Sequence, residues 1–509
     1  MSSIFARSPA QWRKDNARFW SSVSEFYHTH SIDAWDNNVP FYITNNPDFA
    51  HQNAKLIVNY MIDCKSQGYQ GEFILMECGA GLGQFAFLFL NSLFSLLDNT
   101  NINPQSFKYV LCDYSEKTIS FWKNQPQLAP FFANGMLCSS QLYIDEELSV
   151  HCNYDTESLH NKRVILLSNY CFDSLYQSPF ILEKSRFVPC RIIQKANILS
   201  SSPLQLKFKP VKDSPPPYSD CDVYNRIVDS HLQLGAQQTL MPDGPIALIQ
   251  WLDQQTAHPL LIICSDKGFT GFNHGHYGEC FSLVNTGTFH SCVNFLALNS
   301  YVAQALHGSG LLAPEDQVSF GTNIFLTEDA LQKYPALSSE VTSSLQSTGT
   351  LARSRVCRLL YRATTIEKVD ELLNIFAETR YDSFILTRLF TVLESHLQNS
   401  ESLVGTDIDK ILQAFYKNYY FTPHESSLVA LSNIINFSLL VKRFEFAEAL
   451  LDLFLQWHGK DYHYHRLSGL FYFLQSDFTS AAHFFTASLQ DNPDCPTSQS
   501  FLDHCKSLM

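Results

Sequence analysis

The chain has 509 residues, of which 45% are hydrophobic and 17% are charged. This composition is typical of folded globular proteins and excludes a mostly disordered chain, and the length corresponds to roughly two to four compact units. The formal net charge of −14 and the lack of a dense basic run argue against nucleic acid as a substrate or partner, because phosphate contacts need clustered Lys and Arg.

The cysteines and the hydropathy pattern indicate a cytoplasmic protein. Fourteen cysteines are scattered without a CxxC pair or a Cys/His array, and no basic-then-apolar signal sequence opens the chain. The most apolar long stretch, residues 85–97, is too short to span a bilayer and is interrupted by Asn91 and Ser92. We therefore expect reduced thiols and no membrane segment.

The first 337 residues are predicted to form a helical entry segment and an α/β domain. Residues 1–70 should pack as helices on the core, because apolar residues recur at helical spacing within 53–64. Residues 71–337 alternate short apolar strands with helical or turn segments, which is typical of a parallel, Rossmann-like sheet covered on both faces. The strands are predicted at 73–76, 109–112, 164–167, 191–196 and 260–264.

Two loop-rich stretches interrupt this pattern. Serine and proline clusters at 200–203 and 213–219 predict an insertion or helical cap over about 200–245. The polar run at 338–350 predicts a linker, and residues 351–509 have a helical period with few strand signals. An all-α domain should therefore follow the α/β domain.

The last helices show an internal repeat. Phe444 and Ala447 recur as Phe478 and Ala481, at a spacing of 34 residues (478 − 444 = 34), which is the length of the tetratricopeptide repeat (TPR). A generic helical array with the same spacing is the alternative, and both would present a stacked helical surface to a protein partner. The last copy also places Gly469, Tyr472, Phe485 and Pro493 at the offsets of that repeat.

A glycine-rich turn follows the first strand. In ECGAGLG, residues 77–83, Gly79, Gly81 and Gly83 allow a sharp turn and let a ligand approach free N–H groups at a helix N-terminus. About 30 residues on (113 − 83 = 30), the next strand ends in Asp113, where Rossmann-like folds hold an acidic group for ribose hydroxyls. The alternative for Asp113 is to cap the helix that begins near Ser115.

The same motif favours S-adenosylmethionine (SAM) over a dinucleotide. The turn lacks the third glycine of the NAD fingerprint at its usual offset, and a carboxylate at Glu77 can meet the methionine end of SAM. We therefore predict SAM as the cofactor. Its predicted ligands lie in the glycine-rich turn, at the end of the second strand and at the end of the strand at 164–167: Glu77, Gly79, Gly81, Gly83, Asp113 and Ser168.

The third motif, SNYCFDSLY at 168–176, follows a buried strand and should lie at the carboxyl edge of the sheet, where ligands bind in open α/β folds. Methyl transfer needs little beyond placing a nucleophile in line with the sulfonium methyl group. Asn169 and Asp173 are the predicted catalytic residues. Their alternative is structural, since both residue types satisfy backbone groups in turns.

The three motifs together resemble the MidA-like SAM-dependent methyltransferases. That family reads E-x-G-x-G-x-G, then a strand ending in an acidic residue and Ser, then A-N-E-F-F-D-A-L-P. The matching segments are 77–83, 112–115 and 168–176, and weaker similarity extends the resemblance over about residues 40–325. Mitochondrial members methylate an arginine of a respiratory complex I subunit, so the resemblance implies a class I protein methyltransferase. Because the three motifs occur with a 34-residue repeat in one chain, we expect the helical repeats to recruit or orient the protein substrate.

The chain departs from the family pattern at several positions. Tyr170 replaces the Glu after Asn, Tyr176 replaces the closing Pro, and Cys292 and Asn294 replace a later His and Asp. Loss of the carboxylate at position 170 removes a group that could orient or deprotonate a guanidinium, which argues against arginine as the acceptor. The same departures motivate the alternative of a catalytically degenerate fold that serves as a protein-binding scaffold. Methylation of a small molecule is a third alternative, in which the insertion between residues 200 and 245 forms a lid over a compact pocket.

His274 and His276, with Glu279 and Cys280 nearby, invite a metal-site interpretation. Glycine-flanked histidines on a loop are more often solvated or bonded to backbone, and a complete ligand set is missing. We expect no metal.

Overall fold

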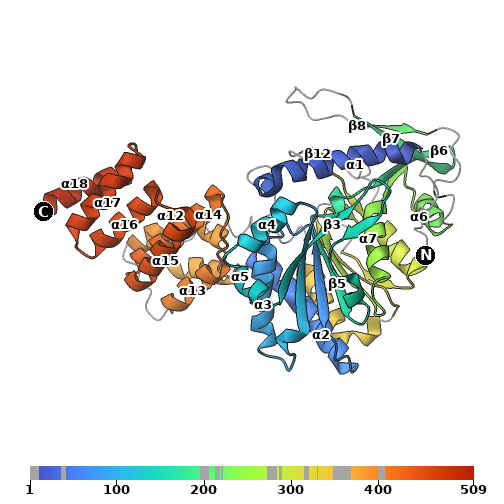
Figure 1. The fold of residues 1–509 in the computed structure, drawn as a ribbon, viewed down its shortest axis with the longest axis horizontal. Helices are drawn as coiled ribbons and strands as arrows, with labels where there is room; N and C mark the ends of the chain where they lie inside the picture. The colour runs from blue at the N-terminus through green and yellow to red at the C-terminus, as the bar shows by residue number, and fades with distance from the viewer. Residues whose placement is uncertain are drawn as a thin grey trace. The chain divides into compact units, whose positions relative to one another are not determined.

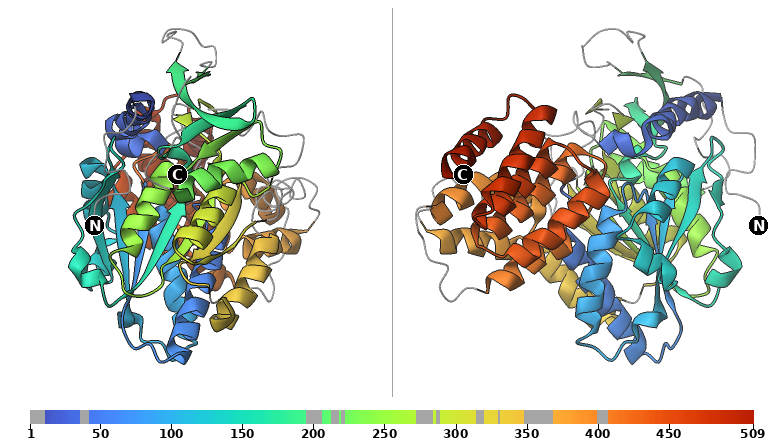
Figure 2. Two further views of the ribbon diagram at one scale, coloured as in Figure 1. Left: turned by 90° about the vertical axis from the view of Figure 1, so that its right-hand side faces the viewer. Right: turned by 60° about the vertical axis from the view of Figure 1, so that its left-hand side comes forward.

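The computed structural model describes residues 11–35, 42–194, 206–211, 218, 222–271, 284–285, 289–313, 320–329, 331–347, 368–398 and 407–509. The chain forms two compact units (Figure 1; Figure 2). The first runs to Arg353, apart from residues 46–48, and the second consists of Asn46–Asp48 and Ser354–Met509.

An eight-stranded sheet forms the centre of the first unit, in the order β15-β16-β10-β5-β1-β2-β3-β4. The five neighbouring strands β3, β2, β1, β5 and β10 are parallel to one another. The outer strands β4, β16 and β15 each pair antiparallel with a neighbour. The strands are β1 Phe73–Cys78, β2 Phe107–Asp113, β3 Leu137–Ile144, β4 Val150–Cys152, β5 Arg163–Asn169, β10 Leu261–Asp266, β15 Ser309–Leu311 and β16 Gly321–Leu326.

The central strands are apolar because both faces of the sheet are covered. Every residue of β1 and β10 is buried, as a doubly covered parallel sheet requires. On one face Phe73 contacts Tyr60 of α2, with ring centroids 6.3 Å apart, whereas Ile74 and Met76 belong to a core cluster with residues of α6, α7 and α8. The covering helices are α2 Pro47–Ser66, α3 Gln84–Leu97, α6 Asp222–Gln233, α7 Asp243–Asp253 and α8 Phe295–Ala305.

Four predicted strands are confirmed: residues 73–76, 109–112, 164–167 and 260–264 lie in β1, β2, β5 and β10, apart from Leu260. The described part of the predicted strand at 191–196 is also a strand, within β7 Arg186–Gln194. It does not belong to the central sheet, because β7 is part of a second sheet. The remaining elements of this unit are α1 Gln11–His30, η1 Ser31–Trp35, η2 Pro104–Ser106, α4 Glu116–Asn124, α5 Ala129–Ala133, η3 Thr156–Leu159, η4 Phe172–Ser174, η5 Leu331–Lys333 and α9 Pro335–Ser347.

The second sheet corrects the predicted insertion. Its order is β8-β7-β6-β9 and all its pairings are antiparallel, so the inserted structure begins at Ser178 rather than near residue 200. The β6–β7 hairpin turns at Lys184, whose φ is 57°, and this turn carries no glycine or proline signal. The strands are β6 Ser178–Glu183, β7 Arg186–Gln194, β8 Leu206–Pro210 and β9 Gln238–Met241; two small sheets pair β11 Gly268–Phe269 with β14 Val293–Asn294 and β12 Val284–Asn285 with β13 Phe289–His290.

The predicted linker at 338–350 is wrong over most of its length, because residues up to Ser347 form the end of α9. The start of α9 is anchored by the Asp63 carboxylate, which accepts the backbone N–H groups of Ala336 at 3.1 Å and Leu337 at 2.8 Å. An acceptor at a helix N-terminus satisfies N–H groups that lack an intrahelical partner. This anchor lies 273 residues away in sequence, beyond the reach of local pattern reading.

Every regular element in the described residues of the second unit is a helix. None of the helices in the described ranges of either unit is long and apolar enough to cross a bilayer. The helices are α11 Val369–Glu378, α12 Ser383–Gln398, α13 Ile408–Asn418, α14 Glu425–Leu440, α15 Phe444–His458, α16 Tyr462–Leu474, α17 Phe478–Asp491 and α18 Pro496–Leu508.

The 34-residue spacing coincides with helix boundaries, since α15 begins at Phe444 and α17 at Phe478. Gly469 of α16 faces Phe485 of α17 so closely that a Cβ at position 469 would lie 2.7 Å from the ring. A small residue is therefore required where these two helices cross. Membership of the TPR family remains a prediction.

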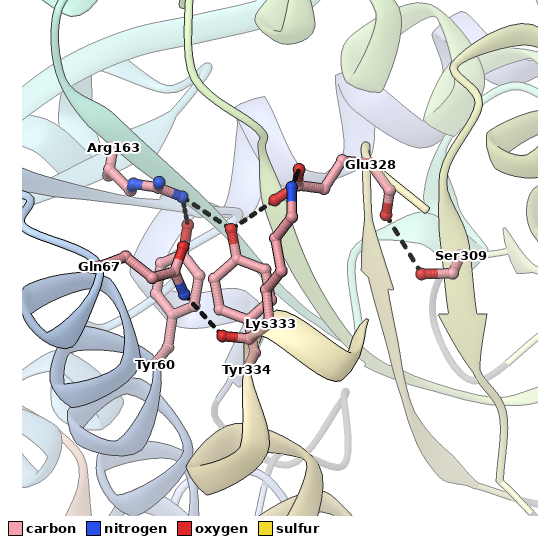
Figure 3. Close-up of polar contacts among 7 residues, drawn as sticks. All are labelled: Tyr60, Gln67, Arg163, Ser309, Glu328, Lys333 and Tyr334. Atoms are coloured by element: carbon pink, nitrogen blue, oxygen red, sulfur yellow. Dashed lines mark hydrogen bonds and ion pairs between the residues drawn. The ribbon is translucent and has the colours of Figure 1, made fainter. Parts of the chain in front are cut away.

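A buried cation joins three elements at the start of β5. The Arg163 guanidinium donates to the Tyr60 hydroxyl of α2 at 3.2 Å and to the Tyr334 hydroxyl before α9 at 2.9 Å (Figure 3). Tyr334 in turn donates to Glu328 at 2.6 Å, so a carboxylate balances the charge through one hydroxyl. Hydrogen bonds to charged groups are stronger than neutral ones, which makes this cluster an anchor for both helices.

We expect Tyr334→Phe to lower the free energy of unfolding by about 1–3 kcal/mol, because it leaves a buried guanidinium N–H of Arg163 without a partner and removes the hydroxyl that links it to Glu328. Urea denaturation measures the change. Tyr143→Phe is the control, since Tyr143 is 42% exposed and its hydroxyl should contribute less than about 0.5 kcal/mol. Equal effects of the two variants would contradict the anchoring role.

Candidate functional site

The strand order reverses between β1 and β5, and a ligand crevice is expected outside the carboxyl ends of strands at such a point. A cavity of about 660 Å³ lies there. Its walls include Cys78 and Gly79 after β1, Asp113 and Tyr114 after β2, and Tyr170 after β5. A second, small cavity of about 30 Å³ lies beside it, and Gly79 and Tyr170 line both.

The glycine-rich turn has the conformation that the motif predicts. Gly79, Gly81 and Gly83 have φ angles of 71°, 52° and 74°, a left-handed region that side chains disfavour. Gly79 lines both cavities and Gly81 the small one. Gly83 lines neither, and a Cβ there would lie 3.1 Å from Trp122, so this glycine permits close packing of α3 rather than contact with the cavities.

Asp113 ends β2 and lines the large cavity. Its Oδ1 accepts the backbone N–H of Ser115 at 2.9 Å, whereas the Ser115 side chain caps α4 by accepting the N–H of Thr118. The N-cap of α4 is therefore Ser115 and not Asp113. Burial raises the pKa of Asp113 to about 6, although backbone N–H groups lower it, so the carboxyl is mostly ionised at neutral pH.

Glu77 lies on the opposite face of β1 from Cys78 and lines the small cavity. The Tyr109 hydroxyl donates to its Oε2 at 2.8 Å. Burial raises the pKa of Glu77 to about 8, so the side chain is mostly protonated at neutral pH. A buried acid held uncharged at the edge of a crevice is characteristic of functional sites.

Asn169, at the end of β5, is a polar side chain without a partner. Its Nδ2 and Oδ1 are both buried and make no hydrogen bond within the part of the chain that the structure describes. The residue lines the small cavity together with Glu77, Gly79 and Gly81. A buried carboxamide that is left unsatisfied costs free energy, and a ligand in this cavity would supply its missing partners.

Two predicted site residues lie away from both cavities. Ser168 is completely buried and Asp173 is 3% exposed, and neither lines the large or the small cavity. Asp173 accepts the Ser174 hydroxyl at 2.9 Å and its N–H donates to Asp266 at 3.1 Å. Burial raises the pKa of Asp173 to about 6, and these contacts give it a structural position behind the crevice.

Sequence reasoning missed two walls of the large cavity. One is β3, where Gln141 and Leu142 line the cavity and the Gln141 side chain donates to the Tyr114 carbonyl at 3.0 Å. The other is α1, which contributes Ser24, Tyr27 and His28. The segment LCSSQLYI of β3 carries a weak alternation, but no local signal shows that α1 returns to the sheet.

Helix α1 is held in place by the inserted sheet, along which it lies (Figure 1). The Asn16 carboxamide donates to the Cys190 carbonyl at 2.9 Å and accepts the Ile192 N–H at 2.8 Å. Its nitrogen and its oxygen therefore both bond to the backbone of β7. The Trp20 indole donates to the Gln177 carbonyl at 3.1 Å. These long-range bonds make α1 a fixed wall of the cavity.

The described ranges of the chain contain no group of three or more His, Cys, Asp or Glu side chains that could hold a metal ion. His274, His276, Glu279 and Cys280, discussed above as a candidate cluster, lie outside those ranges.

Comparisons with known proteins give little beyond this geometry. No protein-family model matches the chain, and no curated protein matches it. Solved structures that resemble it include two members of one superfamily from Burkholderia thailandensis, an uncharacterised protein at 12% identity and a "likely methyl transferase" bound to S-adenosyl-homocysteine at 14%. Each alignment covers 60% of this chain and 80% of the other, with a TM-score of 0.33.

The raised pKa of Glu77 predicts a pH-dependent stability. A carboxyl whose pKa is about 8 when folded and near its ordinary value when unfolded stabilises the fold fully below about pH 4.5, and this contribution is lost as the pH rises toward 8. Glu77→Gln keeps an acceptor for Tyr109 but does not titrate. We expect the variant to gain up to a few kcal/mol relative to wild type between pH 5 and pH 8, measured by urea denaturation. A constant difference over that range would contradict the assignment.

Proposed function

We propose that the chain is a SAM-dependent methyltransferase with its cofactor site at the carboxyl ends of β1, β2 and β5. The observation that carries the proposal is the unpartnered Asn169 carboxamide, which shares a small cavity with the glycine-rich turn. Asp113 lies in the adjoining large cavity, at the end of the strand next to β1. An ionised acceptor, glycines that leave room beside the backbone and a carboxamide donor thus converge on one crevice.

The strand order supports a methyltransferase rather than a dinucleotide-binding enzyme. The dinucleotide-binding order 3-2-1-4-5-6 belongs to a mostly parallel sheet. Here β16 lies antiparallel between β10 and β15, which departs from that arrangement. Fold alone does not determine function, so the contents of the crevice decide the proposal.

Each residue of the crevice has a definite chemical capacity. Bound SAM supplies an activated methyl group on a good leaving group. Asp113 can accept hydrogen bonds from ribose hydroxyls, Gly79 and Gly81 leave room for close approach to the backbone, and the Asn169 carboxamide can orient an acceptor atom or the amino-acid end of the cofactor. Protonated Glu77 can donate to a carboxylate, and if it ionises it can receive an ammonium group.

We further propose a protein acceptor that is recruited by the helical unit, whose paired helices α14 to α17 present a stacked surface. The departure at Tyr170 favours the alternative of a non-catalytic scaffold, since a position between the two cavities carries a phenol in place of a carboxylate. The wall formed by α1 favours the other alternative, a small-molecule acceptor, because a walled cavity of this size suits a compact ligand.

Binding of S-adenosylhomocysteine to the full-length protein tests the cofactor site. We expect Asp113→Asn to weaken binding by about 1.5–3 kcal/mol, the usual contribution of a hydrogen bond to a charged group, as measured by calorimetry at pH 7.5. Because the Asp113 pKa is about 6, the wild-type affinity should fall as the pH drops below 6, whereas that of the variant should not.

Asp155→Asn is the matched control, because Asp155 begins η3 outside both cavities. If calorimetry detects no heat of binding for the wild-type protein at millimolar ligand, the cofactor site is refuted and the non-catalytic scaffold remains as the hypothesis.

Transfer of a labelled methyl group from SAM tests catalysis and separates the acceptor classes. Cell lysate divided by filtration into macromolecular and small-molecule fractions serves as the substrate, and label is expected in the protein fraction. Asn169→Ala should reduce the rate about 10²-fold, a typical loss for an orienting polar group. Asp173→Asn, which alters a side chain behind the crevice, should change the rate less than about threefold. The reverse ranking would restore Asp173 as the catalytic residue.

A further inference from the structure

Two thiols from distant parts of the chain meet in the wall of the large cavity. The Sγ atoms of Cys78, the last residue of β1, and Cys171, two residues after β5, lie 3.4 Å apart. They are 93 residues apart in sequence. Both residues line the cavity, so a small solute that enters it can reach them.

The backbone is shaped to bring these thiols together. Cys78 pairs with Ser168 in the parallel register of β1 and β5, and the chain then turns back at Tyr170, which has a φ of 48°. The Tyr170 N–H donates to the Ser265 carbonyl at 3.0 Å, which holds the turn. Gly79 leaves space for the second thiol, because a Cβ at that position would lie 3.0 Å from the Cys171 Sγ.

We propose that Cys78 and Cys171 form a redox-sensitive thiol pair that a hydroperoxide converts into a disulfide within the large cavity. Closing the bond requires the sulfurs to approach from 3.4 Å to about 2.05 Å.

The reaction balances without a further co-reactant. The sulfur of one cysteine attacks an oxygen of the hydroperoxide, the O–O bond breaks, and a sulfenic acid and one water or alcohol form. The sulfur of the second cysteine then displaces the hydroxyl of the sulfenic acid, and its thiol proton leaves with that hydroxyl as water. The two sulfurs are oxidised and the peroxide is reduced.

The surroundings of Cys171 set the pH dependence. The hydrogen bond with Cys78, burial and the nearby carboxyls of Asp266 and Asp173 all raise the pKa of the Cys171 thiol. Tyr114 and Cys264 also face it. Because the thiolate is the nucleophile, oxidation should be slow near neutral pH and should accelerate as the pH rises.

The disulfide should also act on the crevice. Drawing Cys78 toward Cys171 moves the backbone at Gly79, which lines both cavities, so a ligand held there should bind more weakly after oxidation. A ligand in the cavity should conversely shield both thiols. These two effects rest on the proposed cofactor site, whereas formation of the disulfide does not.

The test treats the full-length protein with hydrogen peroxide at pH 7 and pH 9 and maps disulfides by peptide mass spectrometry. We expect a cross-linked peptide joining Cys78 to Cys171, formed faster at pH 9 and reversed by dithiothreitol. Cys171→Ser should abolish it, whereas Cys152→Ser, which changes a partly exposed thiol outside the cavity, should not. Stable sulfinic acid on both residues, or a disulfide elsewhere, would overturn the proposal.

A second measurement separates this proposal from the proposed function. We expect oxidation to weaken S-adenosylhomocysteine binding about tenfold or more in wild type but not in Cys171→Ser. A disulfide without any cofactor binding would refute only the cofactor site. Cofactor binding that persists unchanged in the disulfide form would refute the coupling between the thiol pair and the crevice.

Discussion

The pairing of β1 between β2 and β5 is the constraint on which the rest of the structure depends. The middle residues of these strands are mostly apolar and are buried, so their register is determined by the core. Their parallel register brings the end of each strand to one edge. As a result Glu77, Asp113 and Asn169 lie around one crevice although 92 residues separate the first from the last (169 − 77 = 92).

The crevice is assembled at a cost to stability. Burial raises the pKa values of Glu77 and Asp113, and the Asn169 carboxamide has no partner in the described structure. Tyr170 is held in a left-handed conformation. Strain and unsatisfied polar groups in a folded protein are concentrated at functional sites, where ligand contacts offset them. The core beneath supplies the stability that permits this arrangement, and the Arg163 cluster ties α2 and the start of α9 to it (Figure 3).

The sequence predicted the parts of this site that depend on local rules. Strand ends, the glycine turn and Asp113 could be read because buried strands are apolar and a tight turn needs positive φ. Ser168 and Asp173 line neither cavity. Ser168 lies within β5, where its side chain points away from that of Asn169, and Asp173 follows the turn at Tyr170, which no local pattern encodes. The contributions of α1 and β3 were missed because they depend on contacts such as that of Asn16 with β7, 174 residues away.

The position of α1 has a consequence for how the crevice forms. One wall comes from residues before β1, and that wall is held by hydrogen bonds to Gln177, Cys190 and Ile192 of the later segment. The cavity is therefore complete only when the beginning of the chain has docked on a sheet made more than a hundred residues later. A ligand in the cavity would bind only the state in which α1 is docked on the inserted sheet. By mass action, ligand binding would therefore stabilise the docking of α1 on that sheet. Ligand binding in the crevice and docking of α1 within the first unit are in this sense coupled equilibria.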